Sequence, residues 1–187
     1  MELSVRLYLG LLAAVAIGRL LELRHSRGNQ QRLRQHGSSQ SPEPGYKWMV
    51  ALHSGVLASS AIEVVFAQSP WIPALGIPAL TLFIAANAAR WWVIRTLGPR
   101  WNVQVMSASQ LGIVTEGPYR WVRHPNYSAV FIEMLALPLI HTAWITAIVG
   151  TALHGMVLRN RVALEEAVMA QDPEWSRAFA AKPRFLP

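Results

Sequence analysis

The sequence predicts an all-α integral membrane protein with about five transmembrane helices, the last two of them a short helical hairpin. Of its 187 residues, 52% are hydrophobic and only 14% are charged, and the mean hydropathy is +0.26. An ordinary soluble domain carries about 25% charged residues, so a bilayer explains this composition better. The basic residues also fall in clusters between apolar runs, which is typical of positive-inside topology.

The same topology accounts for the net charge of +7, so we predict no nucleic-acid partner. The chain has no cysteine, which excludes disulfides, thiolate metal sites and a cysteine nucleophile. Its six histidines show no metal-ligand spacing, and we predict no metal site.

Three apolar runs in the first hundred residues are long enough to span a bilayer. They cover Leu3 to Leu23, Trp48 to Ala67 and Trp71 to about Ala89, each near the ~20 residues that a ~30 Å hydrocarbon core requires. A signal peptide is the alternative for the first run, but Glu2 stands where a positive residue belongs and Arg19 interrupts the segment. We therefore predict three transmembrane helices.

Residues 24–47, after the first helix, are polar and basic, and we expect a loop with little structure of its own. The turn between the second and third helices, residues 68–70, has no charge. Because positive charge stays on the cytoplasmic side, the basic loop is predicted to be cytoplasmic. The N-terminus and the uncharged turn then lie outside.

The apolar block from Ser128 to Leu158 decides the architecture of the second half. Its 31 residues exceed one span but fall short of two full ones, and Pro138 interrupts helical hydrogen bonding near its middle. One long kinked helix would hold its two ends roughly 45 Å apart. A hairpin would bring both ends back to the cytoplasm, and it is favoured because arginines flank the block on both sides.

The hairpin would join two polar motifs into one pocket. These motifs contain Tyr119, Arg123, His124 and Tyr127 before the block, and Arg161, Glu165 and Glu166 after it. Carboxylates can hold cationic or hydroxyl groups, guanidinium groups can hold an oxyanion, and aromatic rings can cover a base or a sulfonium. Nothing in the set resembles a nucleophile with its base, so transfer of an activated group between two bound molecules fits best.

The motifs resemble the isoprenylcysteine carboxyl methyltransferase family of integral membrane enzymes. The resemblance lies in Gly117-Pro118-Tyr119, Arg123-His124-Pro125-x-Tyr127, Arg159-x-Arg161, Glu165-Glu166 and the Pro183-Arg184-Phe185-Leu186-Pro187 end. It covers residues 101–187 strongly and the earlier helices only in topology. It implies two regions: residues 1–100 with three spans, and residues 101–187 as the catalytic region with the hairpin over 128–158.

The resemblance also implies S-adenosylmethionine as methyl donor, in a cytosolic pocket built by the C-terminal half, and a lipophilic acceptor entering from the bilayer. Tyr119, His124, Tyr127 and Glu166 would bind the cofactor. Arg123 and Arg161 would orient the acceptor oxygen, which belongs to a prenylcysteine carboxylate or to a phenol or enol of a long-chain polyketide lipid.

Other interpretations remain open. The arginines also suit topological anchors, and Glu165 suits a helix cap. Phospholipid N-methylation and a non-catalytic, lipid-binding scaffold are the alternative functions. The chain departs from the family's pattern where relatives often carry Tyr after the Glu pair, since it has Trp175 and Phe179. Roles within the spans are undecided for His53, Glu63, Asn87 and Glu133.

Overall fold

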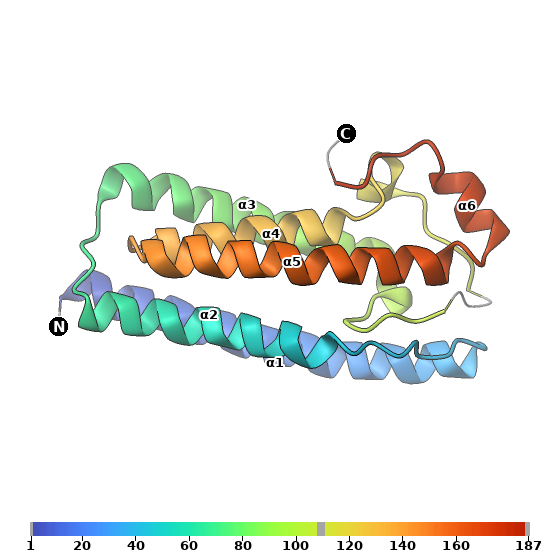
Figure 1. The fold of residues 1–187 in the computed structure, drawn as a ribbon, viewed down its shortest axis with the longest axis horizontal. Helices are drawn as coiled ribbons and strands as arrows, with labels where there is room; N and C mark the ends of the chain where they lie inside the picture. Colours follow the sequence, from blue (N-terminus) through green and yellow to red (C-terminus); the bar gives the residue numbers. More distant parts are fainter. Residues whose placement is uncertain (1, 108–110, 186–187) are drawn as a thin grey trace.

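The computed structural model describes residues 2–107 and 111–185, which form a helical bundle (Figure 1). Its long helices are α1 (Leu3–Gln35), α2 (Tyr46–Phe66), α3 (Pro73–Leu97), α4 (Pro125–Leu139) and α5 (Trp144–Met169). Shorter elements are the 3₁₀ turns η1 (Gly98–Arg100) and η2 (Gly117–Arg120) and helix α6 (Pro173–Phe179). Within the described ranges there is no β-strand, only an isolated bridge between Gln40 and Met106.

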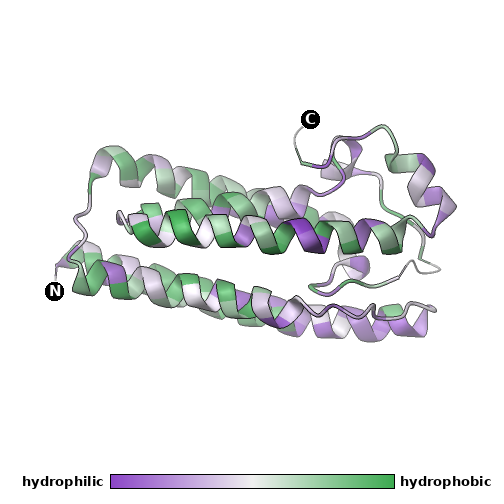
Figure 2. Ribbon diagram, in the orientation of Figure 1, coloured by the Kyte–Doolittle hydropathy of each residue, from purple (hydrophilic) through white to green (hydrophobic). Residues whose placement is uncertain are grey.

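The helices form two layers, with α1 and α2 in one and α3, α4 and α5 in the other (Figure 1). Apolar residues follow most of the bundle, and hydrophilic residues gather at the end that carries α6 (Figure 2). Three segments are long and apolar enough to cross a membrane, namely Leu3–Gln35, Tyr46–Phe66 and Pro73–Arg100. The predicted all-α membrane class is therefore confirmed.

Helices α4 and α5 form a helical hairpin instead of one kinked helix. The turn between them is held by Thr142, whose φ is 53° and whose hydroxyl donates to the carbonyl of Pro70 at 2.5 Å. The start of α5 is capped from α2, because the Glu63 carboxylate accepts the N–H groups of Ile145 and Thr146 at 3.0 and 2.8 Å. This intramembrane carboxylate thus pairs the orphan donors of a helix N-terminus.

The hairpin is longer than the predicted segment over residues 128–158. Helix α4 begins at Pro125, and α5 continues to Met169, because the polar residues after Leu158 carry on the helix beyond the apolar part. The second charged motif consequently lies on the last turns of α5, and the first one leads from η2 into the start of α4.

The predicted loop over residues 24–47 is wrong in its first half, because α1 continues to Gln35. Asn29 donates to the carbonyls of Gly98 and Trp101 at 3.2 and 2.7 Å, and the Ser26 hydroxyl accepts the N–H of Val103 at 2.9 Å. These partners come from a segment about seventy residues later. The polar composition of the stretch therefore reflects side-chain contacts made by a helix.

Four charged residues pair with one another inside the apolar bundle. Arg19 of α1 contacts Glu133 of α4 at 2.7 Å and Glu22 at 2.9 Å, and Arg90 of α3 contacts Glu22 at 2.6 Å. Charges in a bilayer are costly unless they are paired. Glu133 therefore has a structural partner in Arg19. Arg19 lies in the middle of α1, so its side chain pairs inside the bundle and does not extend to the lipid headgroups.

The arrangement gives a topology test. The C-terminal ends of α1 and α5 lie at the same end of the bundle as α6, whereas the connection between α2 and α3 lies at the opposite end (Figure 1). In a chain without native cysteine, Gln35→Cys and Ser176→Cys should react with an impermeant maleimide only from the cytoplasmic side. Ser69→Cys should react only from the outside. Labelling of Ser176→Cys and Gln35→Cys from opposite sides would contradict the hairpin.

Candidate active site

The first polar motif forms η2 and the beginning of α4. Gly117 has a φ of 55°, and a Cβ there would lie 2.6 Å from the Thr96 hydroxyl, so the turn needs glycine. Pro125 occupies the first turn of α4, where its missing N–H leaves no helical bond unmade. His124 immediately precedes the helix, so its side chain and that of Tyr127 leave the same helix start.

The second motif lies on the last turns of α5. Residues four apart share a face of a helix, and the following residue points about 100° away. Arg161 and Glu165 accordingly both contact Tyr127, whereas Glu166 contacts the C-terminal segment through Arg184 at 2.7 Å. The two adjacent glutamates therefore have different surroundings.

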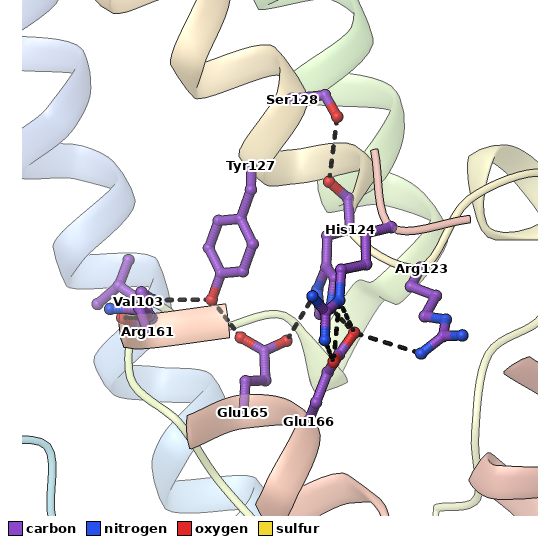
Figure 3. A network of polar contacts seen from close by, with 9 residues as sticks. Val103, Arg123, His124, Tyr127, Ser128, Arg161, Glu165 and Glu166 are labelled. Atoms are coloured by element: carbon purple, nitrogen blue, oxygen red, sulfur yellow. Dashed lines mark hydrogen bonds and ion pairs between the residues drawn. The ribbon is translucent and has the colours of Figure 1, made fainter. Parts of the chain in front are cut away.

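Tyr127 stands between the two motifs (Figure 3). Its hydroxyl accepts from Arg161 Nε at 2.7 Å and donates to Glu165. Its ring stacks on His124, with centroids 5.4 Å apart. His124 in turn lies 3.1 Å from Glu166 through Nε2 and 3.8 Å from Glu165 through Nδ1. The structure thus brings five of the residues predicted to bind cofactor or acceptor into one network: Tyr127, His124, Arg161, Glu166 and, through Glu166, Arg123.

Arg161 is buried, with 7% of its side chain exposed. Besides Tyr127, its guanidinium donates to the Glu43 carboxylate at 2.5 Å, to the Val103 carbonyl at 2.6 Å and to the Met49 sulfur at 3.2 Å. A guanidinium has five N–H groups, so these four contacts leave one for another molecule. A bidentate hold on an acceptor oxygen, as the sequence suggested, requires one of these partners to withdraw.

Arg123 contacts the C-terminal segment. It donates to the carbonyls of Lys182 and Ala180 at 2.8 and 3.1 Å, and it lies 3.4 Å from Glu166. The N–H of His124 donates to the carbonyl of Arg184 at 2.9 Å. The segment after α6 is therefore fastened beside the network.

A cavity of about 150 Å³ lies next to this network. Tyr119, Arg123, His124, Arg161 and Glu165 contribute to its wall, together with Trp175 and Phe179 of α6. Tyr127 and Glu166 do not line it. Burial, aided by the negative charge of Glu165, raises the pKa of Tyr119, so its phenol stays protonated and can donate a hydrogen bond.

The sequence left two of these lining residues, Trp175 and Phe179, without a role. Trp175 and Phe179 face the cavity and stack on one another with centroids 5.4 Å apart. Glu165 was predicted to belong to the pocket, with a helix cap as the alternative, but not to bind the cofactor. Its four-residue spacing from Arg161 was the signal for a shared face, but it identifies a site only once the facing helix is known.

A second cavity, of about 470 Å³, lies between α1 and α3. Its lining is mostly apolar and aromatic, and Arg19 and Glu22 of the buried ion pairs form its polar part. Trp101 lines this cavity, and the next residue, Asn102, lines the first one. The two cavities are therefore neighbours, one at the polar end of the bundle and one among its apolar helices.

The chain is similar in sequence to a known protein family and to two bacterial proteins. The model of the isoprenylcysteine carboxyl methyltransferase (ICMT) family matches residues 79–171. The uncharacterized protein YpbQ of Bacillus subtilis (strain 168) is 28% identical over 164 residues, covering 86% of this chain and 95% of YpbQ. An uncharacterized Haemophilus influenzae protein is 33% identical over 92 residues, covering 49% of this chain and 54% of that protein.

A solved structure shares the fold. It is that of the eukaryotic intramembrane Ras methyltransferase ICMT, with 25% sequence identity and a TM-score of 0.52. The match covers 65% of this chain but only 45% of that one, so the chain spans less than half of the eukaryotic protein. The fold similarity thus includes much of the bundle described above.

The central position of Tyr127 gives a testable prediction. Tyr127→Phe removes the hydroxyl that accepts from Arg161 Nε and donates to Glu165, so each of these two groups loses one hydrogen bond. We expect a loss of about 1–3 kcal/mol in unfolding free energy, measured by thermal or denaturant unfolding in detergent. Tyr46→Phe, on a tyrosine without a described side-chain hydrogen bond, is the control. Equal stability of the two variants would contradict the network.

Proposed function

The chain belongs to the isoprenylcysteine carboxyl methyltransferase family, and we propose that it transfers a methyl group from S-adenosylmethionine to an oxygen of a lipophilic acceptor. The observation that carries the proposal is the network around Tyr127 beside a cavity at the polar end of the bundle, together with a larger cavity among the apolar helices that adjoins the first at Trp101 and Asn102. Such a site serves a polar donor and an apolar acceptor at once.

The first cavity fits the cofactor by its chemistry. S-adenosylmethionine supplies an electrophilic methyl group on a sulfonium, and it carries an adenine ring, an ammonium and a carboxylate. Tyr119, Trp175 and Phe179 provide aromatic surfaces for a flat base and for a cation. Glu165 provides a carboxylate for a cationic or hydroxyl group. The 150 Å³ of this cavity is below the ~300–1,000 Å³ of typical ligand pockets, so we expect its walls to move apart when the cofactor binds.

Of the remaining residues predicted to bind the cofactor, one lines the cavity and two contact the residues that line it. His124 lines it directly, with its ring fixed between Tyr127 and Glu166. Tyr127 and Glu166 lie behind and hold Glu165 and His124 in place. The cofactor-binding set we propose is therefore Tyr119, His124 and Glu165 in contact, with Tyr127 and Glu166 as their supports.

Arg161 and Arg123 remain the proposed groups for the acceptor oxygen. Arg161 lines the cavity and keeps one N–H without a described partner, which suits a single charge-assisted hydrogen bond to a carboxylate or a phenolate. Its fixed positive charge stabilises such an oxyanion without reorganisation. An amine acceptor gains nothing from this charge, so oxygen methylation is the better proposal.

The cavity between α1 and α3 is the proposed place for the apolar part of the acceptor. It is bounded by Ala14, Gly18 and Leu21 on α1 and by Phe83 and Trp91 on α3. An alkyl or prenyl chain buried there gains about 0.8 kcal/mol per methylene. We infer that the acceptor head then lies toward Trp101, where the two cavities adjoin.

The decisive experiment joins binding to product analysis. Purified protein in detergent should bind S-adenosylmethionine in calorimetry. With methyl-labelled cofactor it should methylate an S-farnesylated N-acylcysteine, an alkylresorcinol or a lipid of the host membrane, identified by mass. A product methylated on nitrogen would show phospholipid amine methylation, and protein that binds no cofactor would be a scaffold.

The two glutamates give the sharpest prediction on the cofactor. Because Glu165 lines the cavity and Glu166 does not, Glu165→Gln should weaken S-adenosylmethionine binding by about 1.5–3 kcal/mol, the range for a hydrogen bond to a charged group. The sequence alone favoured Glu166 for this role. In calorimetry, Glu166→Gln should weaken binding less, since it acts only through His124. Weaker cofactor binding by Glu166→Gln than by Glu165→Gln would show that Glu166 is the glutamate that contacts the cofactor.

The acceptor cavity gives a second prediction. A Cβ at Gly18 meets no atom within 4 Å, so Gly18→Leu places a side chain into the cavity without a clash in the helix. We expect a rise in KM for a long-chain acceptor of at least about tenfold, since its chain loses roughly 1.4 kcal/mol or more of burial. Cofactor affinity should not change. Gly10→Leu, on the same helix but outside the cavity, is the control. An equal KM for both variants would show that the alkyl chain of the acceptor binds elsewhere.

A further inference from the structure

Glu43 pairs with Arg161 although it lies 118 residues earlier in the chain. It belongs to residues 36–45, which connect α1 with α2, and it is outside the matched family residues 79–171. Its carboxylate is 2.5 Å from Arg161 Nη1, with 6% of the Glu43 side chain and 7% of the Arg161 side chain exposed. Neither the sequence motifs nor the comparisons assign this residue a role.

The connector holds the carboxylate in a defined position. Its backbone pairs with residues 105–107, since Ser41 N–H donates to the Val105 carbonyl at 3.0 Å and Ser107 N–H donates to the Ser39 carbonyl at 2.9 Å. The N–H of Val105 reaches the second oxygen of Glu43 at 3.4 Å. One carboxylate oxygen therefore faces Arg161, and the other is held by the segment that lines the cofactor cavity.

Without Glu43, the other partners of Arg161 would not neutralise its charge. Tyr127 holds Nε and Val103 holds Nη2, and both are neutral. Glu43 supplies the one negative charge that directly contacts the guanidinium among the described residues. A buried guanidinium without a counter-charge would turn toward Glu165 on the same helix face.

We propose that Glu43 is a positioning residue that fixes the Arg161 guanidinium beside the cofactor cavity and keeps Glu165 free of it. The inference rests on the proposed function, because it assigns Arg161 to the acceptor oxygen. Glu43 itself touches neither cofactor nor acceptor. A polar connector that contains glycine and proline thereby sets the geometry of a residue on α5.

Titration of Glu43 supplies a signature for this role. Burial raises the pKa of the Glu43 carboxyl, and the nearby charge of Glu165 raises it further, against the opposing effect of Arg161. Arg161 and Glu165 on α5 are the charged groups that face it, with Tyr127 of α4 beyond Arg161. A raised pKa means that the ion pair is complete at higher pH and is lost as the pH falls through that value. Methyl transfer should show the same acid limb.

The test compares Glu43→Gln and Glu43→Asp with the wild type in the full-length chain in detergent. The acceptor is whichever probe the wild type methylates, the S-farnesylated N-acylcysteine or the alkylresorcinol. For Glu43→Gln we expect kcat to fall at least about tenfold and the acid limb of kcat to disappear, while the Kd for S-adenosylmethionine stays within about twofold. Glu43→Asp keeps the charge and should recover part of kcat. Glu116→Gln, at an exposed carboxylate, should match the wild type.

A double-mutant cycle separates positioning from general support of the fold. Because Glu43 acts through Arg161, adding Glu43→Gln to Arg161→Lys should lower kcat no further than about twofold. Three outcomes would overturn the inference while the wild type remains a methyltransferase. They are a double variant whose loss of kcat equals the product of the two single losses, an unchanged kcat in Glu43→Gln, and a loss of cofactor affinity equal to the loss of kcat. A wild type that binds no S-adenosylmethionine would instead overturn the proposed function, and this inference with it.

Discussion

The Arg161 guanidinium is the contact on which the polar end of the molecule depends. It joins α5 to α4 through Tyr127, to the α1–α2 connector through Glu43 and to the segment after η1 through Val103. A buried cation must be paired and hydrogen-bonded to remain in an apolar protein. The requirement to satisfy one arginine therefore draws together four segments that are far apart in the sequence, and the cavity of about 150 Å³ lies among them.

The same electrostatic constraint operates deeper in the bundle. Arg19, Glu22, Arg90 and Glu133 neutralise one another across α1, α3 and α4, and Glu63 neutralises the N-terminus of α5. These pairs hold helices together where apolar side chains cannot, because lipid is as apolar as the helix surface. Two of them, Arg19 and Glu22, also line the α1–α3 cavity, so residues that join the helices also supply part of its polar wall.

Much of the fold follows from composition and periodicity. Apolar runs of bilayer length predict α1, α2 and α3, and an apolar block too long for one helix, broken at Pro138, predicts the α4–α5 hairpin. The site followed from two motifs and from the hairpin that joins them. The prediction failed for residues 24–35, where polar residues form a helix because Asn29 and Ser26 bond to backbone groups near Trp101. Local composition cannot show a partner about seventy residues away.

The sequence by itself determined the class of protein, the number of apolar helices and the residue types that gather at their ends, since these depend on hydropathy, on charge and on spacing along the chain. Only the tertiary structure decided which of two adjacent glutamates lines the cavity and which holds the C-terminal segment. It also decided that Glu43 pairs with Arg161. The reason is physical: the direction of a side chain depends on the rotation of its helix against the neighbours, and a buried charge takes whichever partner that packing brings within reach.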